Sequence, residues 1–165
     1  MKQVSNIDDR QTRTSVERSG DCEFFVKCTF NASAAAVFRA WSQPDLFRLW
    51  WLPKSMTGAS LTSCVMDVRT GGRYRLEFGA CGSETVAFHG HYVEVIPDRS
   101  IVWTNDEEEE GALTTVTLED RDGQTQLTFR EMYPSTDALE EALQGSATAL
   151  PEQFRQLDEL LASMV

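Results

Sequence analysis

The stretch HGHYVE, residues 89–94, holds the side chains of this sequence that are best suited to chemistry. His89 and His91 stand two residues apart, which places them on the same face of a strand. Two imidazoles can bind a metal or act as a general base. A metal site needs a further ligand, however, and the chain has no other histidine. We therefore expect two exposed or singly hydrogen-bonded histidines, and neither a metal nor another cofactor.

Metal-free acid–base catalysis inside a cavity is the second chemistry that this region allows. The candidate groups are Glu77, His89, His91, Tyr92 and Glu94, and the pattern does not single out one of them. The sequence has no nucleophile elbow, no phosphate-binding loop, no dinucleotide-binding motif and no zinc-protease motif. An enzyme is therefore the less expected alternative, and its catalytic residues are unknown.

The direction in which these side chains point is not fixed by simple alternation. Phe88 and Tyr92 mark one face of the expected strand as apolar, whereas Val93 and Val95 mark the other face. A β-bulge near Gly90 would reconcile the two patterns. Whether the two histidines and the glutamate that follows them face a cavity is therefore left open.

The segment FRAWSQPDLFRLWWLP, residues 38–53, contains three of the four tryptophans of the chain. Trp50 and Trp51 are adjacent, so one flat core face cannot easily bury both. They are explained either as a packed corner or as the wall of a binding site, because such sites are rich in aromatic residues. We expect Trp50 to point inward and Trp51 to pack against the loop that follows.

Composition bounds the class of protein. The chain has 165 residues, of which 41% are hydrophobic and 25% charged, and its net charge is −11. These values are typical of one soluble domain, and the acidic balance argues against nucleic acid or an anionic membrane as partner. No apolar run is long enough for membrane insertion, and the N-terminus lacks the apolar region of a secretory signal.

Cysteine usage indicates the cellular compartment. Cys22, Cys28, Cys64 and Cys81 form no CxxC pair and lie in or beside apolar segments. Mostly buried thiols in a reducing cytosol are expected in preference to disulfides. We therefore predict a cytoplasmic protein.

The order of elements predicts the architecture. We expect a flexible arm over residues 1–12 and one domain over residues 13–165. In the domain, an extended pair is followed by a helix of about ten residues capped by Asn31 or Ser33, and then by a short helix from Pro44 to Trp50. Alternating segments from residue 64 to residue 132 predict an antiparallel meander, with Asp122-Gly123 at one hairpin tip.

Two helical segments follow the meander. TDALEEAL predicts a short helix, and an apolar stripe from Leu150 to Met164 predicts a terminal helix with Thr148 as its N-cap. One helix must then cover a whole sheet, and it does so most simply if the sheet curves around it. The fold class is therefore α+β, with a cavity between the sheet and the terminal helix.

Four blocks in the same order resemble a known family. They are FNASAAAVFRAWSQPDLFRLWWLP, DVRTGGRYRLEF, HGHYVEVIPDRSIVWT and TTVTLEDRDGQTQLTF, and PSTDALEEALQG and FRQLDELLA extend the likeness to about residues 23–163. The chain is similar to homologues of the heat-shock-protein-90 ATPase activator, in the START-like, polyketide-cyclase-like superfamily (SRPBCC). It departs from the family pattern at Ala149 and Pro151.

The resemblance implies a helix-grip fold that encloses an apolar pocket, and a superfamily whose members bind hydrophobic molecules or catalyse cyclisation or hydrolysis. A co-chaperone-like activator of the chaperone ATPase is a further alternative. We do not expect chaperone binding, because the co-chaperone activators carry an additional N-terminal domain that a polar extension of about 20 residues cannot replace. A homodimer is left open.

The leading hypothesis is a protein that binds a hydrophobic or aromatic small molecule between the sheet and the terminal helix. A cyclase-type or hydrolase-type enzyme acting in the same cavity is the alternative. The residues predicted to line the cavity are apolar or amphipathic and lie on expected inward faces: Trp41, Trp50, Leu76, Phe78, Phe88, Tyr92, Trp103, Phe129, Phe154 and Leu157.

Overall fold

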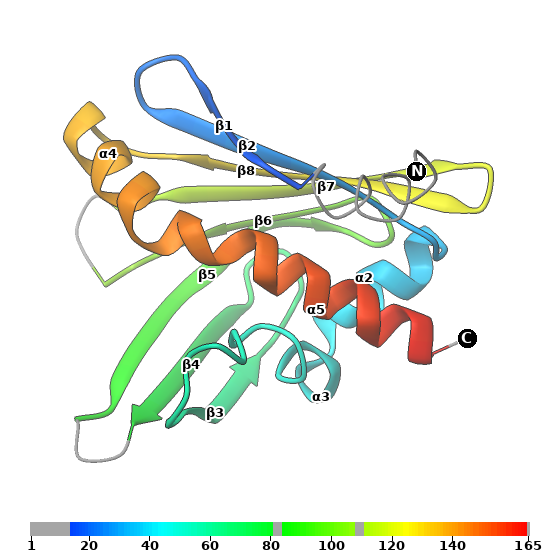
Figure 1. Cartoon of the computed structure of the whole chain (residues 1–165), viewed down its shortest axis with the longest axis horizontal. Helices are drawn as coiled ribbons and strands as arrows, with labels where there is room; N and C mark the ends of the chain where they lie inside the picture. Colours follow the sequence, from blue (N-terminus) through cyan, green and yellow to red (C-terminus); the bar gives the residue numbers. More distant parts are fainter. Residues whose placement is uncertain (1–13, 81–83, 108–110, 165) are drawn as a thin grey trace, which may run out of the picture.

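The computed structural model describes residues 14–80, 84–107 and 111–164. They form one antiparallel sheet in the strand order β1-β2-β8-β7-β6-β5-β4-β3, so the last six strands make a continuous meander (Figure 1). The predicted arm over residues 1–12 lies outside the described residues. The strands are β1 (Val16–Ser19), β2 (Glu23–Phe30), β3 (Ala59–Met66), β4 (Arg73–Ala80), β5 (Val86–Ile96), β6 (Ser100–Thr104), β7 (Leu113–Arg121) and β8 (Gln124–Met132).

Local sequence determines where the first two helices begin and end. The Ser33 hydroxyl accepts a hydrogen bond from the amide of Ala36 and so caps α2 (Ala34–Ser42), as predicted. Pro44 stops that helix and opens α3 (Pro44–Phe47). This second helix is shorter than the predicted span to Trp50, since the chain continues from Phe47 as turns.

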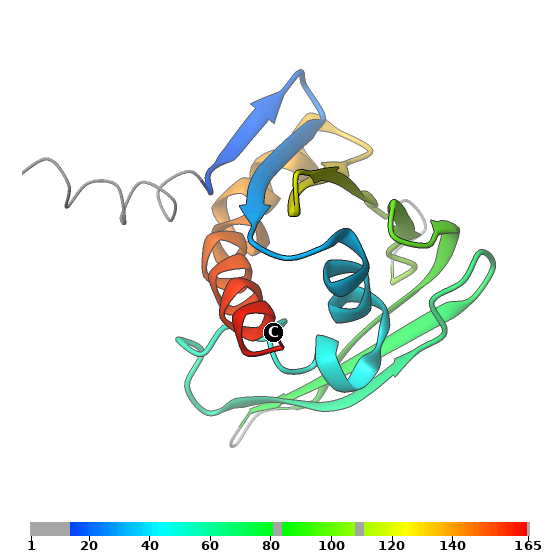
Figure 2. The same ribbon diagram turned by 90° about the vertical axis from the view of Figure 1, so that its right-hand side faces the viewer.

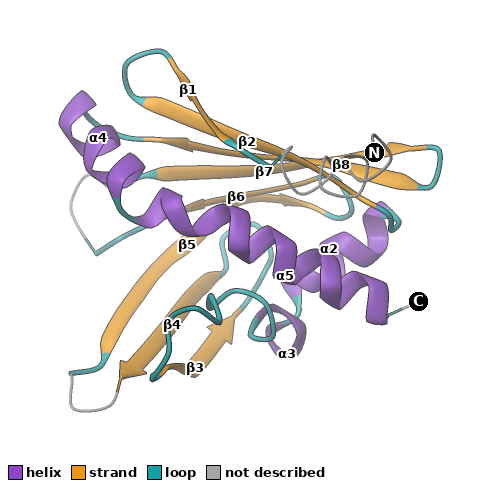
Figure 3. Ribbon diagram, in the orientation of Figure 1, coloured by secondary structure: helices purple, strands orange, loops and turns teal. Residues whose placement is uncertain are grey.

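The sheet curves around the helices, which all lie on its concave side (Figures 2 and 3). Helix α4 (Thr136–Gln144) and the 3₁₀ turn η1 (Ser146–Ala149) lead into the terminal helix α5 (Leu150–Ser163). This helix packs against β2 and α2, while α3 packs against β3. The protein therefore has the predicted helix-grip fold. No helix of the described part is long and apolar enough to cross a membrane.

One local prediction was wrong and two are confirmed. Ala149, rather than Thr148, precedes the first residue of α5, because η1 occupies residues 146–149, and Pro151 then falls in the first turn, where no amide donor is needed. The predicted β-bulge near Gly90 is present, as a register shift of β5 between Tyr92 and Glu94 that turns both Tyr92 and Val95 towards the core. The hairpin tip at Asp122-Gly123 is confirmed, with positive φ at both residues.

The inner face of the sheet carries the core. On β2 it presents Phe24, Val26 and Phe30, all fully buried, and on β8 it presents Leu127 and Phe129. The terminal helix contributes the predicted apolar stripe: Leu150, Phe154, Leu157 and Leu161 are buried. Cys22 and Cys64 are thiols.

Candidate ligand-binding site

Three tryptophans pack at the corner between α2 and the turns after α3. The ring centroid of Trp41 lies 4.7 Å from that of Trp50 and 6.0 Å from that of Trp51. Trp50 is fully buried, and its Nε1–H donates a hydrogen bond of 3.0 Å to the carbonyl oxygen of Ala40. Trp51 is partly buried and stacks on Phe47. The corner therefore encloses Trp50 completely and leaves part of Trp51 accessible.

Two buried glutamines of α5 hold this corner in place. Gln156 Nε2 donates to the carbonyl oxygens of Trp50 and Leu52, and its Oε1 accepts from the amide of Lys54 at 2.8 Å. Gln153 Nε2 donates to the carbonyl oxygen of Trp51 at 2.5 Å. The backbone polar groups of a buried loop need such partners. The terminal helix thus fixes the tryptophan segment through its polar residues as well as its apolar stripe.

Aromatic rings join the corner to the sheet. The centroid of Trp41 lies 5.8 Å from that of Trp103 on β6 and 6.3 Å from those of Phe129 on β8 and Phe154 on α5. Phe129 and Phe154 are buried, whereas Trp103 is only partly buried. The interior between α2, α5 and β8 is therefore filled by rings, and its accessible boundary lies at Trp103.

Beyond that boundary, the inner face of β4 and β5 carries apolar residues that the helices cover incompletely. Phe88 is the register partner of Leu76, and Val86 is the partner of Phe78, so all four share one face. The rings of Phe78 and Phe88 meet edge to face at 5.7 Å. Leu76 is buried, but Phe88 is 42% exposed and Val86 is 52% exposed. This uncovered surface, defined by these four residues, is called the β4–β5 apolar surface below.

A carboxylate lies on the same inner face of the sheet. Glu131 follows Phe129 by two residues on β8 and therefore shares its face. Its carboxylate accepts hydrogen bonds from the hydroxyls of Thr114 at 2.7 Å and Tyr133 at 2.5 Å. Burial raises the pKa of Glu131, and these two hydrogen bonds offset only part of that effect. Thr114 is the register partner of Trp103, so the carboxylate stands close to the boundary of the aromatic interior.

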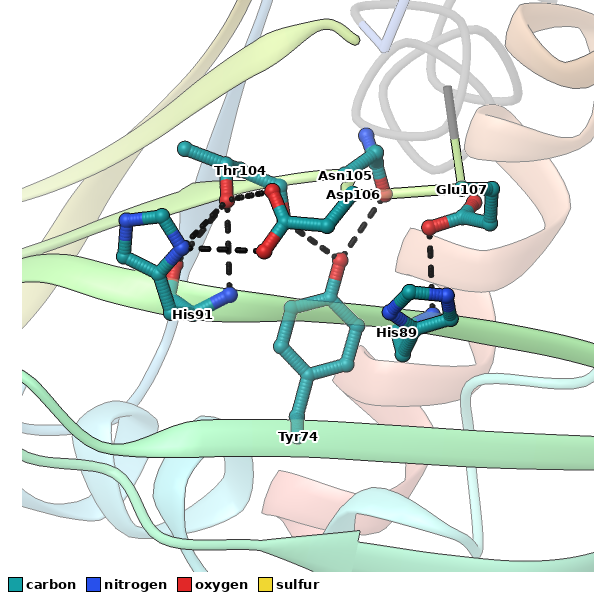
Figure 4. A network of polar contacts seen from close by, with 7 residues as sticks. All are labelled: Tyr74, His89, His91, Thr104, Asn105, Asp106 and Glu107. Atoms are coloured by element: carbon teal, nitrogen blue, oxygen red, sulfur yellow. Dashed lines mark hydrogen bonds and ion pairs between the residues drawn. The ribbon is translucent and has the colours of Figure 1, made fainter. Parts of the chain in front are cut away.

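The two histidines belong to a network on the outer face of the sheet (Figure 4). His91 Nδ1 lies 3.0 Å from Asp106 Oδ2, and the Thr104 hydroxyl donates to Asp106 Oδ1 at 2.7 Å. The amide of His89 donates to Glu107. Burial acts to raise the pKa of Asp106, but hydrogen bonds from His91 and Thr104 outweigh it and hold that pKa below its ordinary value. The network ties β5 to the segment that leaves β6.

Two hollows lie apart from the β4–β5 apolar surface. One, of about 420 Å³, lies on the outer face over β2, β7 and β8 and is lined by threonines together with Lys27 and Arg130. The other lies beside the turn between β5 and β6 and includes Arg99 and Leu118. Within the described ranges, no three side chains of His, Cys, Asp or Glu gather in a way that could hold a metal ion.

Comparison with known proteins places the chain in a family. The family model described as "Activator of Hsp90 ATPase homolog 1-like protein" matches residues 31–162. The chain belongs to the AHSA1 family. No curated protein sequence matches it.

Several solved structures share the fold. A protein from Rhodobacter sphaeroides has a TM-score of 0.80 and 23% identity, over 92% of this chain and 99% of that chain. A protein from Nitrosomonas europaea has a TM-score of 0.80 and 18% identity, over 89% and 98%. An AHSA1-like protein from Aeromonas hydrophila has a TM-score of 0.65 and 18% identity, over 82% and 92%. AHSA1 family membership supports a ligand-binding or activator-like role.

The structure divides the predicted cavity-lining residues of this AHSA1-family chain into two groups. One group is enclosed in the aromatic interior or on the helix that packs against it: Trp41, Trp50, Phe129, Phe154 and Leu157. The other lies along the inner face of β4, β5 and β6, from buried Leu76 and Tyr92 through partly buried Phe78 and Trp103 to exposed Phe88. The two groups meet at Trp41 and Trp103.

Four of the five candidate catalytic groups lie on the outer face, among them Glu77, which alternates with inward-facing Leu76 and Phe78 on β4. Because β5 pairs His89 with Arg75 and His91 with Arg73, both histidines share the outer face with these arginines. Glu94 pairs with Val102 and is exposed on the same outer side. Among the five candidates, Tyr92 lies on the inner face, where it is 4% exposed, and burial raises its pKa.

Sequence reasoning missed Glu131, Gln153 and Gln156. The alternation LTFREM could have placed Glu131 on the apolar side, because Leu127, Phe129 and Glu131 stand two residues apart. The two glutamines flank the apolar stripe of α5, but their partners lie about a hundred residues earlier in the chain. No local pattern indicates such contacts.

Proposed function

We propose that this AHSA1-family protein binds a hydrophobic or aromatic small molecule on the concave side of its sheet, between the β4–β5 apolar surface and α5. The observation that supports this most strongly is the exposure of Phe88, which is 42% exposed although it shares a face with buried Leu76. A half-covered aromatic surface next to a few polar groups is typical of ligand sites. The ligand would lie with its apolar body against Phe78 and Phe88 and extend along β5 towards Trp103, whose register partner Tyr92 stands four residues beyond Phe88.

The partly buried ring of Trp103 defines the inner end of this site. It lies beside its register partner Tyr92 on one side and Thr114 on the other. Glu131, which accepts a hydrogen bond from Thr114, supplies the polar group at that end. A ligand that covers the β4–β5 apolar surface therefore reaches one carboxyl group and two aromatic rings.

A ligand screen with a matched pair of variants tests the proposal. Hydrophobic and aromatic compounds are screened by thermal shift and by tryptophan fluorescence, and the dissociation constant of each hit is then measured. Phe88→Ser removes an inner-face ring, and we expect it to weaken binding by about tenfold, since burying such a ring is worth roughly 1.5–3 kcal/mol. Val65→Ser alters a valine on β3 that is 61% exposed on the outer face, and it should change affinity less than about twofold.

The proposal fails if no compound binds, or if the two variants weaken binding equally. An equal loss of affinity in both variants would indicate that each substitution acts by destabilising the whole protein. Unfolding curves of both variants in the absence of ligand control for that effect.

Acid–base catalysis by Glu131 is the second candidate function. It is favoured by the raised pKa of a carboxyl group on the inner face of the sheet, because burial lets such a group keep a proton to a higher pH than an exposed carboxyl group does. If a bound compound is converted, Glu131→Gln should abolish conversion while affinity changes only a few fold. Recovery of every bound compound unchanged after long incubation, as measured by mass spectrometry, would contradict this function.

A further inference from the structure

Two neighbouring tryptophans differ in how their indole N–H groups are satisfied. Trp50 Nε1 donates to the carbonyl oxygen of Ala40 at 3.0 Å. Trp41 is 2% exposed, and its Nε1 is buried without any hydrogen-bond acceptor among the described residues. Buried polar groups are nearly always hydrogen-bonded, and one left unpaired lowers stability. The ring contacts of Trp41 explain why the side chain is buried, but they do not explain why its N–H lacks an acceptor.

The position of Trp41 suggests what its N–H is for. Its ring contacts Trp103 at 5.8 Å and Trp51 at 6.0 Å, and both of these rings are only partly buried. Trp41 therefore contacts two rings that reach the accessible surface, and one of them, Trp103, is also the inner end of the proposed site. A small displacement of either ring would give a bound molecule access to the Trp41 N–H.

We propose that the indole N–H of Trp41 donates a hydrogen bond to a neutral oxygen acceptor, such as a ketone or ester carbonyl, on the bound ligand. This inference rests on the proposed function, because it names the chemistry of the molecule held at the same site. An N–H donor selects an oxygenated ligand over a hydrocarbon of the same shape. A neutral oxygen fits better than a carboxylate, because Glu131 lies on the same inner face and the chain carries a net charge of −11.

The test compares two probes of the same shape, 2-acetylnaphthalene and 2-isopropenylnaphthalene, on three proteins. The ketone offers one acceptor, and the hydrocarbon offers none. In the wild-type protein we expect the ketone to bind about fivefold more tightly, since a hydrogen bond contributes about 1 kcal/mol. Trp41→Phe keeps an aromatic ring but removes the donor, so the preference should fall to about one. Trp50→Phe, whose donor is already engaged by Ala40, should retain the preference.

A readout without ligand separates an unsatisfied donor from one bonded to a buried water. Trp50→Phe leaves the Ala40 carbonyl without its partner, whereas Trp41→Phe removes a group that has none. Trp50→Phe should therefore lower the Tm by about 2–4 °C more than Trp41→Phe. In an NMR spectrum of the indole region, the Trp41 N–H signal, assigned through its loss in Trp41→Phe, should shift downfield with the ketone and not with the hydrocarbon.

The remaining outcomes would contradict either the inference about Trp41 alone or the proposed function as well. Equal losses of Tm would mean that the Trp41 N–H is already satisfied, and the inference would be wrong. Binding of both probes with no ketone preference, or with a preference that survives Trp41→Phe, would overturn the inference and leave the proposed function standing. If neither probe binds at any concentration tested, both the inference and the proposed function fail for aromatic ligands.

Discussion

The hydroxyl of Tyr74 and the carbonyl oxygen that it hydrogen-bonds leave no room for a side chain at Gly90. The two residues are register partners on β4 and β5, and the hydroxyl passes over the glycine to donate to the Thr104 carbonyl oxygen at 2.7 Å. A Cβ on Gly90 would lie 1.8 Å from that carbonyl oxygen and 2.8 Å from the hydroxyl. The close approach of β5 to the end of β6 therefore depends on glycine at this position.

Gly90→Ala should destabilise the protein by roughly 2–4 kcal/mol, through backbone overlap and loss of the tyrosine hydrogen bond. Gly79→Ala on β4 is the matched control, because its Cβ would meet only a methyl group of Thr62 at 3.3 Å. Urea unfolding followed by tryptophan fluorescence measures both variants. Equal stability of the two would show that the segment after β6 can move away freely.

Gln156→Met should destabilise the protein by roughly 2–3 kcal/mol, because it leaves the backbone groups of Trp50, Leu52 and Lys54 without their partner. Arg155→Met, at an exposed neighbouring position of the same helix, should cost less than about 0.5 kcal/mol. The tryptophan emission of the folded Gln156→Met variant should also change, since the segment that carries Trp50 and Trp51 loses its attachment to α5. An unchanged emission spectrum and unchanged stability would rule out this role for the glutamine.

The stability contribution of Glu131 should decrease as pH rises. Burial raises its folded pKa above the unfolded value of about 4.3, so between these two values the folded protein binds more protons than the unfolded chain. The difference in unfolding free energy between Glu131→Gln and the wild type should therefore move in favour of the variant from pH 4 towards pH 8. Glu94→Gln, on the exposed outer face, controls for the loss of a charge. If the unfolding free energies of the wild type and of Glu131→Gln changed equally with pH, this assignment would be wrong.

The outer-face network should matter little for binding. Asp106→Asn removes the contacts of Asp106 with His91 and Thr104, and because these groups are exposed we expect a loss of less than about 1 kcal/mol at pH 7. Since the folded pKa of Asp106 is lowered, this contribution is present above its unfolded pKa and is lost as pH falls through the lower folded value. Ligand affinity should stay within about twofold of wild type. A tenfold loss of ligand affinity would indicate that the ligand binds on the outer face instead.

Much of this architecture could be predicted because its signals are local. Ser33 caps α2 through an amide three residues away, and the alternation of Tyr74, Leu76 and Phe78 marks the inner face of β4 without reference to another strand. The fold then follows from the order of the elements, since the meander and one terminal helix have a single simple arrangement.

The site could be predicted only in part, because its decisive features depend on contacts between distant segments. From the sequence alone, Gly90 indicates a nearby bulge. Only the position of the Thr104 carbonyl oxygen in the structure shows why a side chain is excluded there. Trp41 and Trp50 look equivalent in the sequence, yet only Trp50 finds an acceptor for its N–H among the described residues. Which of the two indole N–H groups is hydrogen-bonded depends on the path of the chain after α3.

The most direct test of the central claim is an NMR titration of the protein with the tightest-binding compound from the screen. We predict that the perturbed resonances lie on the inner face, at Leu76, Phe78, Phe88 and Trp103, while outer-face Val65 and Val102 stay unperturbed. Perturbations confined to the outer face, around Lys27 and Arg130, would contradict the account.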